Sequence, residues 1–434
     1  MADYFDTLSS RSLYHQVASL LLYQSIFDNE VGTAFLQLLK TLYEGHGKLP
    51  AKGLTSADCL QAYCQWFRNL ATRNQSWQDF IVKQILINSN PFSDRVHKES
   101  LELLPSSLIE AAKHDLKILQ SLYQCSGRQI SDWLKTASQT SLNLPVWNLD
   151  NTINNFLHQN CDWSENLAEL AACYRQQGTG IFAEYQAFSW QSGKLQGIAH
   201  PDPIEVSELV GYETQKAALI QNTECLLAGY PALNILLYGS RGSGKSSLVK
   251  SLLQAFSKRG LRLIEVSKSE LKDLPVIVEK LRNLPQKFIL FVDDLSFEED
   301  DDAFKALKVV LEGSLTAKAK NVAVYATSNR RHLIREFFSD RPHPSDGEEV
   351  HAWDTLQEKL SFSDRFGLTL TFEPANQETY LTIVRHLAQK ANINLSQEVL
   401  EFRAKQWATR HNGRSGRSAR QFIDYLQGEL IIGE

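Results

Sequence analysis

The sequence predicts an α/β fold with a five-stranded parallel sheet core, a C-terminal helical lid and a mostly helical N-terminal domain. Three observations carry this prediction. Apolar runs and helical patterns alternate from residue 205 onward, which is typical of a parallel sheet covered on both faces. The first of these runs leads into a glycine-rich loop and then into a helical pattern. Outside this region, before residue 198 and after Pro374, the periodicity is mainly helical.

Helical periodicity dominates the N-terminal part of the chain. Apolar residues recur at helical spacing in segments 13–26, 35–43, 59–70, 80–87 and 107–123. The last segment opens with Ser107-x-x-Glu110, the pattern of a capping box. The polar stretch 138–160 predicts an internal loop or a loosely folded connection. We interpret an aromatic group as core packing, with a base-stacking platform as the alternative; it comprises Trp66, Phe67, Trp77 and Phe80.

We expect a hairpin at 181–190, with Gly193 near its turn. After it, the sequence pattern changes from mainly helical to alternating strands and helices. The segment His200-Pro-Asp-Pro-Ile marks a boundary, because two nearby prolines cannot continue regular structure. The expected domains are therefore 1–198, 205–373 and 374–434. The strands expected in the middle domain are 233–238, 261–266, 288–292, 322–327 and 368–372, and the helices between them include 245–256, 271–284 and 303–313.

The loop after the first of these strands has the pattern of a P-loop, Gly239-x-x-x-x-Gly244-Lys245-Ser246. Glycines let the backbone curl so that amide N–H groups point at a phosphate, and the next helix adds the positive end of its dipole. Lys245 would contact the β- and γ-phosphates, and the Ser246 hydroxyl would hold the accompanying Mg²⁺. The residues expected to bind the nucleotide here are Gly239, Ser240, Arg241, Gly242, Ser243, Gly244, Lys245, Ser246 and Ser247.

Polar residues follow later strands of the middle domain. Asp293 and Asp294 end the third strand, where one carboxylate can hold Mg²⁺ and the other can prepare a water for attack on the γ-phosphate. The alternative is that both acids cap the following loop. Asn329 ends the fourth strand and could hydrogen-bond that water or a γ-phosphate oxygen. Arg365 precedes the fifth strand, and Arg417 opens the last helix.

Together these landmarks resemble the AAA+ ATPases over residues 205–430, and their finer detail resembles the bacterial branch known as domain of unknown function 815. The resemblance implies an ATP site in which Asp294 is the catalytic base and Asn329 is sensor 1. It makes Arg365 an arginine finger, in an Asp-Arg-Phe-Gly segment similar to that of the Holliday-junction branch-migration motor, and Arg417 sensor 2. Val210-Gly211-Tyr212 looks like the family's segment beside the adenine ring. Most members carry Glu where this chain has the shorter Asp294, which puts fast hydrolysis in doubt.

Composition limits the partners of the chain. Its 434 residues carry a formal net charge of -5, which argues against a nucleic-acid or anionic-membrane footprint over the whole chain but leaves a local basic patch open. The six cysteines show no spacing typical of zinc binding or of a disulfide framework. Because no secretory signal or membrane-spanning run is recognisable, we expect a cytoplasmic protein.

The function expected from these features is an assembly-dependent ATPase that uses ATP and Mg²⁺ to remodel or load a macromolecular client. A trans-acting Arg365 implies a homo-oligomer, either a ring or a helical assembly. The N-terminal domain would bind the client, which the sequence does not identify as protein or nucleic acid. The alternative is a nucleotide-gated binding module with little hydrolysis. A small-molecule kinase or GTPase is a third possibility. It is disfavoured because no Asn-Lys-x-Asp guanine signature follows the fourth strand.

Overall fold

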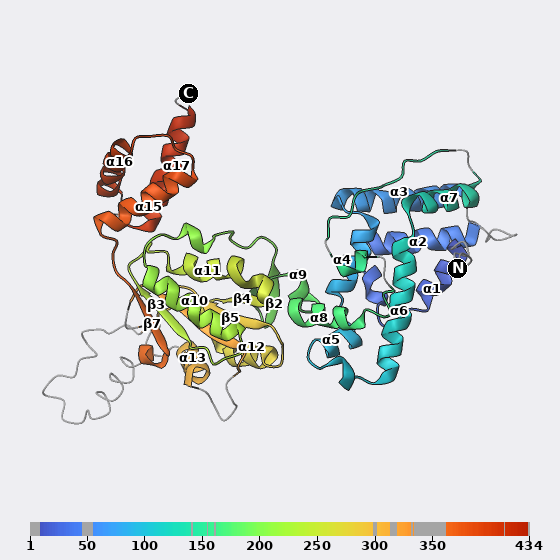
Figure 1. Cartoon of the computed structure of the whole chain (residues 1–434), viewed down its shortest axis with the longest axis horizontal. Coiled ribbons are helices and arrows are strands. Elements are labelled where there is room, and N and C mark those ends of the chain that lie inside the picture. Colours follow the sequence, from blue (N-terminus) through green and yellow to red (C-terminus); the bar gives the residue numbers. More distant parts are fainter. Residues whose placement is uncertain are drawn as a thin grey trace. The chain divides into compact units, whose positions relative to one another are not determined.

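The computed structural model divides into two compact units, Met1–Glu184 and Tyr185–Glu434. We describe each unit by itself (Figure 1). The structure describes residues 9–45, 55–139, 142–153, 155–159, 162–297, 302–312, 319–330, 333, 362–411 and 413–432. Among these residues no helix is both long enough and apolar enough to cross a bilayer.

The first unit is built from helices around one apolar core. Its α-helices are α1 (Ser10–Ala18), α2 (Glu30–Gly45), α3 (Ser56–Arg73), α4 (Trp77–Ile87), α5 (Pro91–Val96), α6 (Ser106–Gln124), α7 (Gly127–Ser138), α8 (Leu167–Gln177) and α9 (Ile181–Glu184). The core interpretation of the aromatic group is confirmed, because Trp66, Trp77 and Phe80 are at most 4% exposed and Phe67 packs against the same core. The capping box expected at Ser107 is wrong. Helix α6 begins one residue earlier, with Pro105 at its cap and no side-chain cap hydrogen bond.

The polar stretch after α7 is an internal loop, one of the two predicted alternatives, and it contains a short helix, η3 (Phe156–His158). Its described residues are hydrogen-bonded to the helices rather than loosely folded. The Tyr63 hydroxyl donates to the carbonyl of Pro145 at 2.8 Å, and the Trp147 indole donates to the carbonyl of Gln75 at 3.0 Å. These bonds satisfy backbone carbonyls that a helix or strand would otherwise pair.

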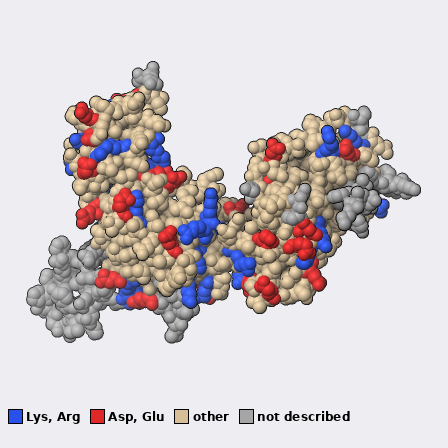
Figure 2. All heavy atoms as spheres, viewed as in Figure 1, with Lys and Arg blue, Asp and Glu red and all other residues tan. Residues whose placement is uncertain are grey.

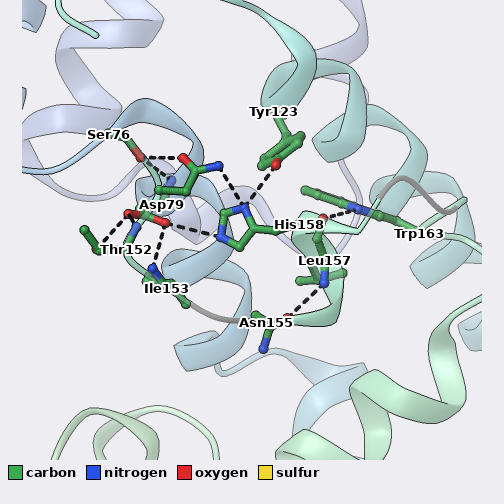
Figure 3. Close-up of polar contacts among 10 residues, drawn as sticks. Ser76, Asp79, Tyr123, Thr152, Ile153, Asn155, Leu157, His158 and Trp163 are labelled. Atoms are coloured by element: carbon green, nitrogen blue, oxygen red, sulfur yellow. Dashed lines mark hydrogen bonds and ion pairs between the residues drawn. The ribbon is translucent and has the colours of Figure 1, made fainter. Parts of the chain in front are cut away.

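The main anchor of this stretch is the buried carboxylate of Asp79 on α4 (Figure 3). One oxygen accepts from the backbone N–H and the hydroxyl of Thr152, at 2.7 and 2.9 Å. The other lies 3.2 Å from Nε2 of His158, whose Nδ1 lies 3.0 Å from the Tyr123 hydroxyl. Burial raises the pKa of Asp79, but the hydrogen bonds from Thr152 and Ile153 and the nearby His158 outweigh that effect and lower the pKa overall. Burial raises the pKa of Tyr123, so this hydroxyl stays protonated. Asp79, His158 and Tyr123 therefore form a structural network that links the loop to the helices.

The second unit contains a seven-stranded sheet in the order β2-β1-β4-β5-β6-β3-β7. Its strands are β1 (Ala187–Gln191), β2 (Lys194–Ile198), β3 (Ile235–Gly239), β4 (Leu261–Val266), β5 (Lys287–Val292), β6 (Val322–Ser328) and β7 (Leu368–Phe372). Every neighbouring pair is parallel except β1 with β2. The predicted fold class is confirmed, and the sheet has seven strands where the sequence predicts five. The extra two form a hairpin with Gly193 at its turn, as predicted, but it spans 187–198 rather than starting at residue 181, because residues 181–184 form helix α9. Its strand β1 pairs with β4.

Helices cover both faces of this sheet, which explains the uninterrupted apolar runs of its strands. Helices α10 (Glu213–Leu227) and α11 (Lys245–Phe256) share one core with alternate strand residues such as Ile289 and Phe291. Helices α12 (Leu274–Leu281) and α13 (Asp302–Glu312) lie on the other side (Figure 1). The lid is α15 (Gln377–Lys390), α16 (Gln397–Arg410) and α17 (Gly416–Ile432), which pack around a separate apolar core.

Charged side chains of both signs occur on both units on the face shown in Figure 2. This mixture agrees with the weakly acidic net charge of the chain. The three functional domains with boundaries at 198/205 and 373/374 remain predictions.

We predict that Asp79→Asn destabilises the first unit by about 1–3 kcal/mol at neutral pH, because three donors on Thr152 and Ile153 lose a charged acceptor that is itself buried. The folded-state pKa of Asp79 is lowered, so its stabilising contribution is complete above the ordinary carboxyl range and is lost as the pH falls through the folded value. Chemical denaturation at several pH values should therefore show the gap between wild type and variant shrinking in acid. Exposed Asp132→Asn on α7 is the control, and a gap that is constant with pH would contradict the role of the ionised carboxylate.

Candidate functional site

The loop between β3 and α11 curls tightly at glycines that no other residue could replace without strain. Gly239 has a φ of 134°, and a Cβ added there would lie 2.0 Å from the carbonyl oxygen of Phe372 on β7. Gly242 has a φ of 74°, and a Cβ there would lie 3.0 Å from the Ser415 hydroxyl at the entrance of the lid. The glycines therefore allow the loop to pass between β7 and the lid.

Lys245 is the first residue of α11, and its ammonium group lies beneath this loop. Its Nζ donates to the carbonyls of Gly239 and Ser240, at 3.0 and 2.7 Å, and lies 3.4 Å from the side-chain oxygen of Asn329. Burial lowers the pKa of Lys245, the carboxylates of Asp293 and Asp294 counteract this, and Arg417 adds to it. The structure thus places a partly desolvated cation where the P-loop pattern predicts the phosphate-binding lysine.

Asp293 is at the carboxyl end of β5, and hydroxyl groups from two other elements converge on it. The Ser246 hydroxyl on α11 donates to Asp293 Oδ1 at 2.6 Å, and the Thr327 hydroxyl on β6 donates to the same oxygen at 2.5 Å. Neither contact uses Oδ2. A serine hydroxyl and a carboxylate side by side are oxygen ligands of the kind that Mg²⁺ prefers.

Asp294 has an unusual backbone for a residue other than glycine, with a φ of 51°. Its N–H donates to the Thr327 hydroxyl at 3.0 Å, and its carboxylate accepts from the Asn329 amide at 2.7 Å. Asn329 therefore contacts both Asp294 and Lys245. The structure brings together the two acids, the lysine and the asparagine that the sequence predicts to act together.

The lid contacts the loop through its last helix. The backbone N–H of Arg417, in the first turn of α17, donates to the carbonyl of Gly242 at 3.2 Å. On the other side, Gly211 has a φ of 87° and lies against Thr379 of α15. The lid and the loop thus meet through a backbone hydrogen bond, and Arg417 also lines the cavity beside the loop.

A second lid contact is ionic and involves Glu208, which ends the short helix η4 (Val206–Glu208). Its carboxylate pairs with Lys390 at the end of α15 and lies 3.9 Å from Arg420 of α17. The hydrogen bond from Lys390 is the main reason that the pKa of Glu208 is lowered. This pairing ties the lid to the segment that carries Val210 and Gly211.

These groups line one cavity of about 730 Å³, a volume in the range of small-molecule and cofactor sites. The predicted site residues that line it are Val210, Gly211, Arg241, Gly242, Ser243, Gly244, Lys245, Ser246, Ser247, Asp293, Asp294, Asn329 and Arg417. Gly239 and Ser240 do not line the cavity but accept hydrogen bonds from Lys245.

Arg365, the predicted finger, does not line this cavity. It ends the short helix η8 (Phe362–Arg365) and forms an ion pair with Glu312, the last residue of α13. The side chain of Arg365 is 17% exposed. Among the residues that the structure describes, Arg365 is therefore paired with the end of α13 and lies outside the lining of the cavity that contains Lys245.

Thr327, Glu208 and Arg420 also line the cavity, although the sequence analysis assigns no specific role to any of them. For Thr327 the available signal was its position two residues before Asn329, since alternate residues of a strand face the same side. For Glu208 there was no local signal, because its lid partners are distant in the sequence.

Comparisons with known proteins give one family and several solved structures. A family model described as protein of unknown function (DUF815) matches residues 183–430. One similar structure is the RuvB Holliday junction branch migration motor of Thermotoga maritima, with 14% identity, a TM-score of 0.33, and coverage of 52% of this chain and 72% of that chain. Another is domain III of the replication initiation protein DnaA from Thermotoga maritima, with 18% identity, a TM-score of 0.38, and coverage of 54% and 92%. Both TM-scores are low.

Proposed function

This chain belongs to the DUF815 family of proteins of unknown function, and we propose that it is an AAA+ type ATP-binding protein with an assembly-dependent ATPase activity. The observation that carries the proposal is the convergence of Lys245, Asp293 and Asn329 on one cavity under a glycine loop. A lysine beneath curled amides suits phosphate groups, and the paired serine and aspartate suit a magnesium ion. Coupling of turnover to a macromolecular client remains a prediction.

The residues present fit a magnesium-bound nucleotide. Ser246 and Asp293 would hold Mg²⁺, which would supply neutralising charge to the phosphate oxygens. Lys245 would exchange its contacts with the carbonyls of Gly239 and Ser240 for the phosphates, because a charged acceptor binds an ammonium group more strongly than a neutral one.

In this proposal Asp294 accepts the proton of the attacking water. Its carboxylate is already fixed by the Asn329 amide at 2.7 Å, so the base is oriented before substrate binds. Arg417, at the first turn of the lid helix, would contact the phosphates and draw the lid closed.

One observation favours the alternative of a nucleotide-gated module. The side chain of Asp294 is short and one of its oxygens is engaged by Asn329, which limits its reach toward a water. In that case nucleotide would bind and move the lid without appreciable turnover. The two candidates differ in phosphate release from the assembled protein.

We predict that Lys245→Ala weakens Mg–ATP binding roughly 10- to 100-fold and reduces phosphate release to background, because the phosphates lose a charge-assisted hydrogen bond. Titration calorimetry and a phosphate-release assay measure the two effects. Lys250→Ala, on the same helix but outside the cavity lining, is the matched control and should behave as wild type. Wild-type binding without phosphate release would favour the gated module, and the absence of Mg–ATP binding would contradict both candidates.

We further predict that Arg365→Ala lowers turnover about 10³-fold or more if the arginine acts on a neighbouring subunit, as expected for a finger supplied in trans. For this role, Arg365 would either leave its ion pair with Glu312 or keep it at a position beside the nucleotide site of the neighbouring subunit. Mixing equal amounts of Arg365→Ala and Lys245→Ala proteins should restore activity at roughly a quarter of the interfaces of a head-to-tail assembly. No recovery in a mixture shown to co-assemble would argue against action in trans.

A further inference from the structure

One hydroxyl group from a different strand contacts both neighbouring acids, in addition to the bond from the Asp294 N–H to Asp293 Oδ1 at 3.1 Å. Thr327, near the end of β6, is 2% exposed, and β6 pairs directly with β5. Its Oγ1 donates to Asp293 Oδ1 at 2.5 Å and accepts from the backbone N–H of Asp294 at 3.0 Å. A single hydroxyl can fill both roles because it carries one donor and two acceptor sites.

Each of these bonds fixes a different property of the acids. The bond to Asp293, together with the one from Ser246, occupies Oδ1 and fixes the orientation of the carboxylate. The bond from the Asp294 N–H supports a backbone in the left-handed region, at a φ of 51°. Most L-residues avoid that region, and Asp and Asn reach it more readily than longer side chains do.

The side chain of Asp294 is fixed from the same strand. Asn329 is two residues after Thr327, and both line the cavity. Thr327 therefore holds the backbone of Asp294 while Asn329 holds its carboxylate at 2.7 Å. The left-handed turn and these two contacts therefore define both the backbone and the carboxylate of Asp294.

We propose that Thr327 is a positioning residue that orients Asp293 for the magnesium ion and keeps Asp294 in its left-handed turn. This inference rests on the proposed function, since it assigns Thr327 a role in that site. It has two consequences. Loss of the hydroxyl should affect the magnesium-dependent part of nucleotide binding and leave the magnesium-independent part intact. Lengthening Asp294 to Glu should impair the site, although glutamate is the usual base in AAA+ ATPases.

The direct test compares Thr327→Val, which replaces the hydroxyl with a methyl group of similar shape, with Thr327→Ser, which keeps it. Thr371→Val is the matched control, because Thr371 is also at a strand end and bonds the Tyr238 hydroxyl but does not line the cavity. For each protein, ATP affinity is measured by calorimetry in EDTA and over a magnesium titration, and turnover is measured in parallel.

Thr327→Val should raise the half-saturating magnesium concentration and lower turnover by about 10- to 100-fold, the effect of losing a hydrogen bond to a charged group. Its affinity for ATP in EDTA should match wild type, and Thr327→Ser should restore most of the loss. A Thr327→Val protein with the magnesium dependence of wild type would overturn the inference, as would a Thr327→Ser protein as impaired as the valine variant.

Asp294→Glu provides a second measurement, which does not require the valine variant to fold. It should lower turnover relative to wild type, and an increase would overturn the role assigned to the left-handed turn. If wild-type protein binds no Mg–ATP, the proposed function fails and this inference fails with it. If wild-type protein binds Mg–ATP and the Thr327 variants all match it, only the inference about Thr327 fails.

Discussion

The parallel pairing of β6 with both β3 and β5 is the constraint on which the candidate site depends. Register pairs Tyr238 with Ser328 and Val292 with Ala326, so three strands end at nearly the same level. The residues that follow them are the glycine loop, Asp293 and Asn329, which are far apart in the sequence. Because parallel strands present their carboxyl ends at one edge, this pairing alone brings a cation, two acids and an amide together.

Hydrogen bonds then convert this proximity into a defined arrangement. Asp293 Oδ1 joins α11, β5 and β6 through the hydroxyls of Ser246 and Thr327. The lid adds a further connection, because the backbone N–H of Arg417 on α17 donates to the carbonyl of Gly242. In the proposed function, this bond would transmit nucleotide binding at the loop directly to the lid.

Much of the second unit could be predicted from local pattern, and the rest depends on contacts that no local pattern encodes. The run Phe288–Val292 is buried throughout, which is why its apolar residues are continuous and its strand is easy to recognise. The hairpin was also recognisable, but its pairing with β4 was not, because Phe188 and Ile264 are distant in the sequence. In the first unit, Ser107 is not a cap because the helix already begins at Ser106, with Pro105 at its cap. The left-handed backbone of Asp294 and the double contact of Thr327 likewise come from tertiary structure.

The most direct test of the central claim is an experimental structure of the protein with Mg²⁺ and a non-hydrolysable ATP analogue. We expect phosphates against the loop at Gly242 and Gly244, with Lys245 Nζ moved from the carbonyls of Gly239 and Ser240 to a phosphate oxygen. The metal should lie beside Ser246 and Asp293. An analogue bound elsewhere, or phosphates in this cavity with Lys245 still on the loop carbonyls, would contradict the proposed site.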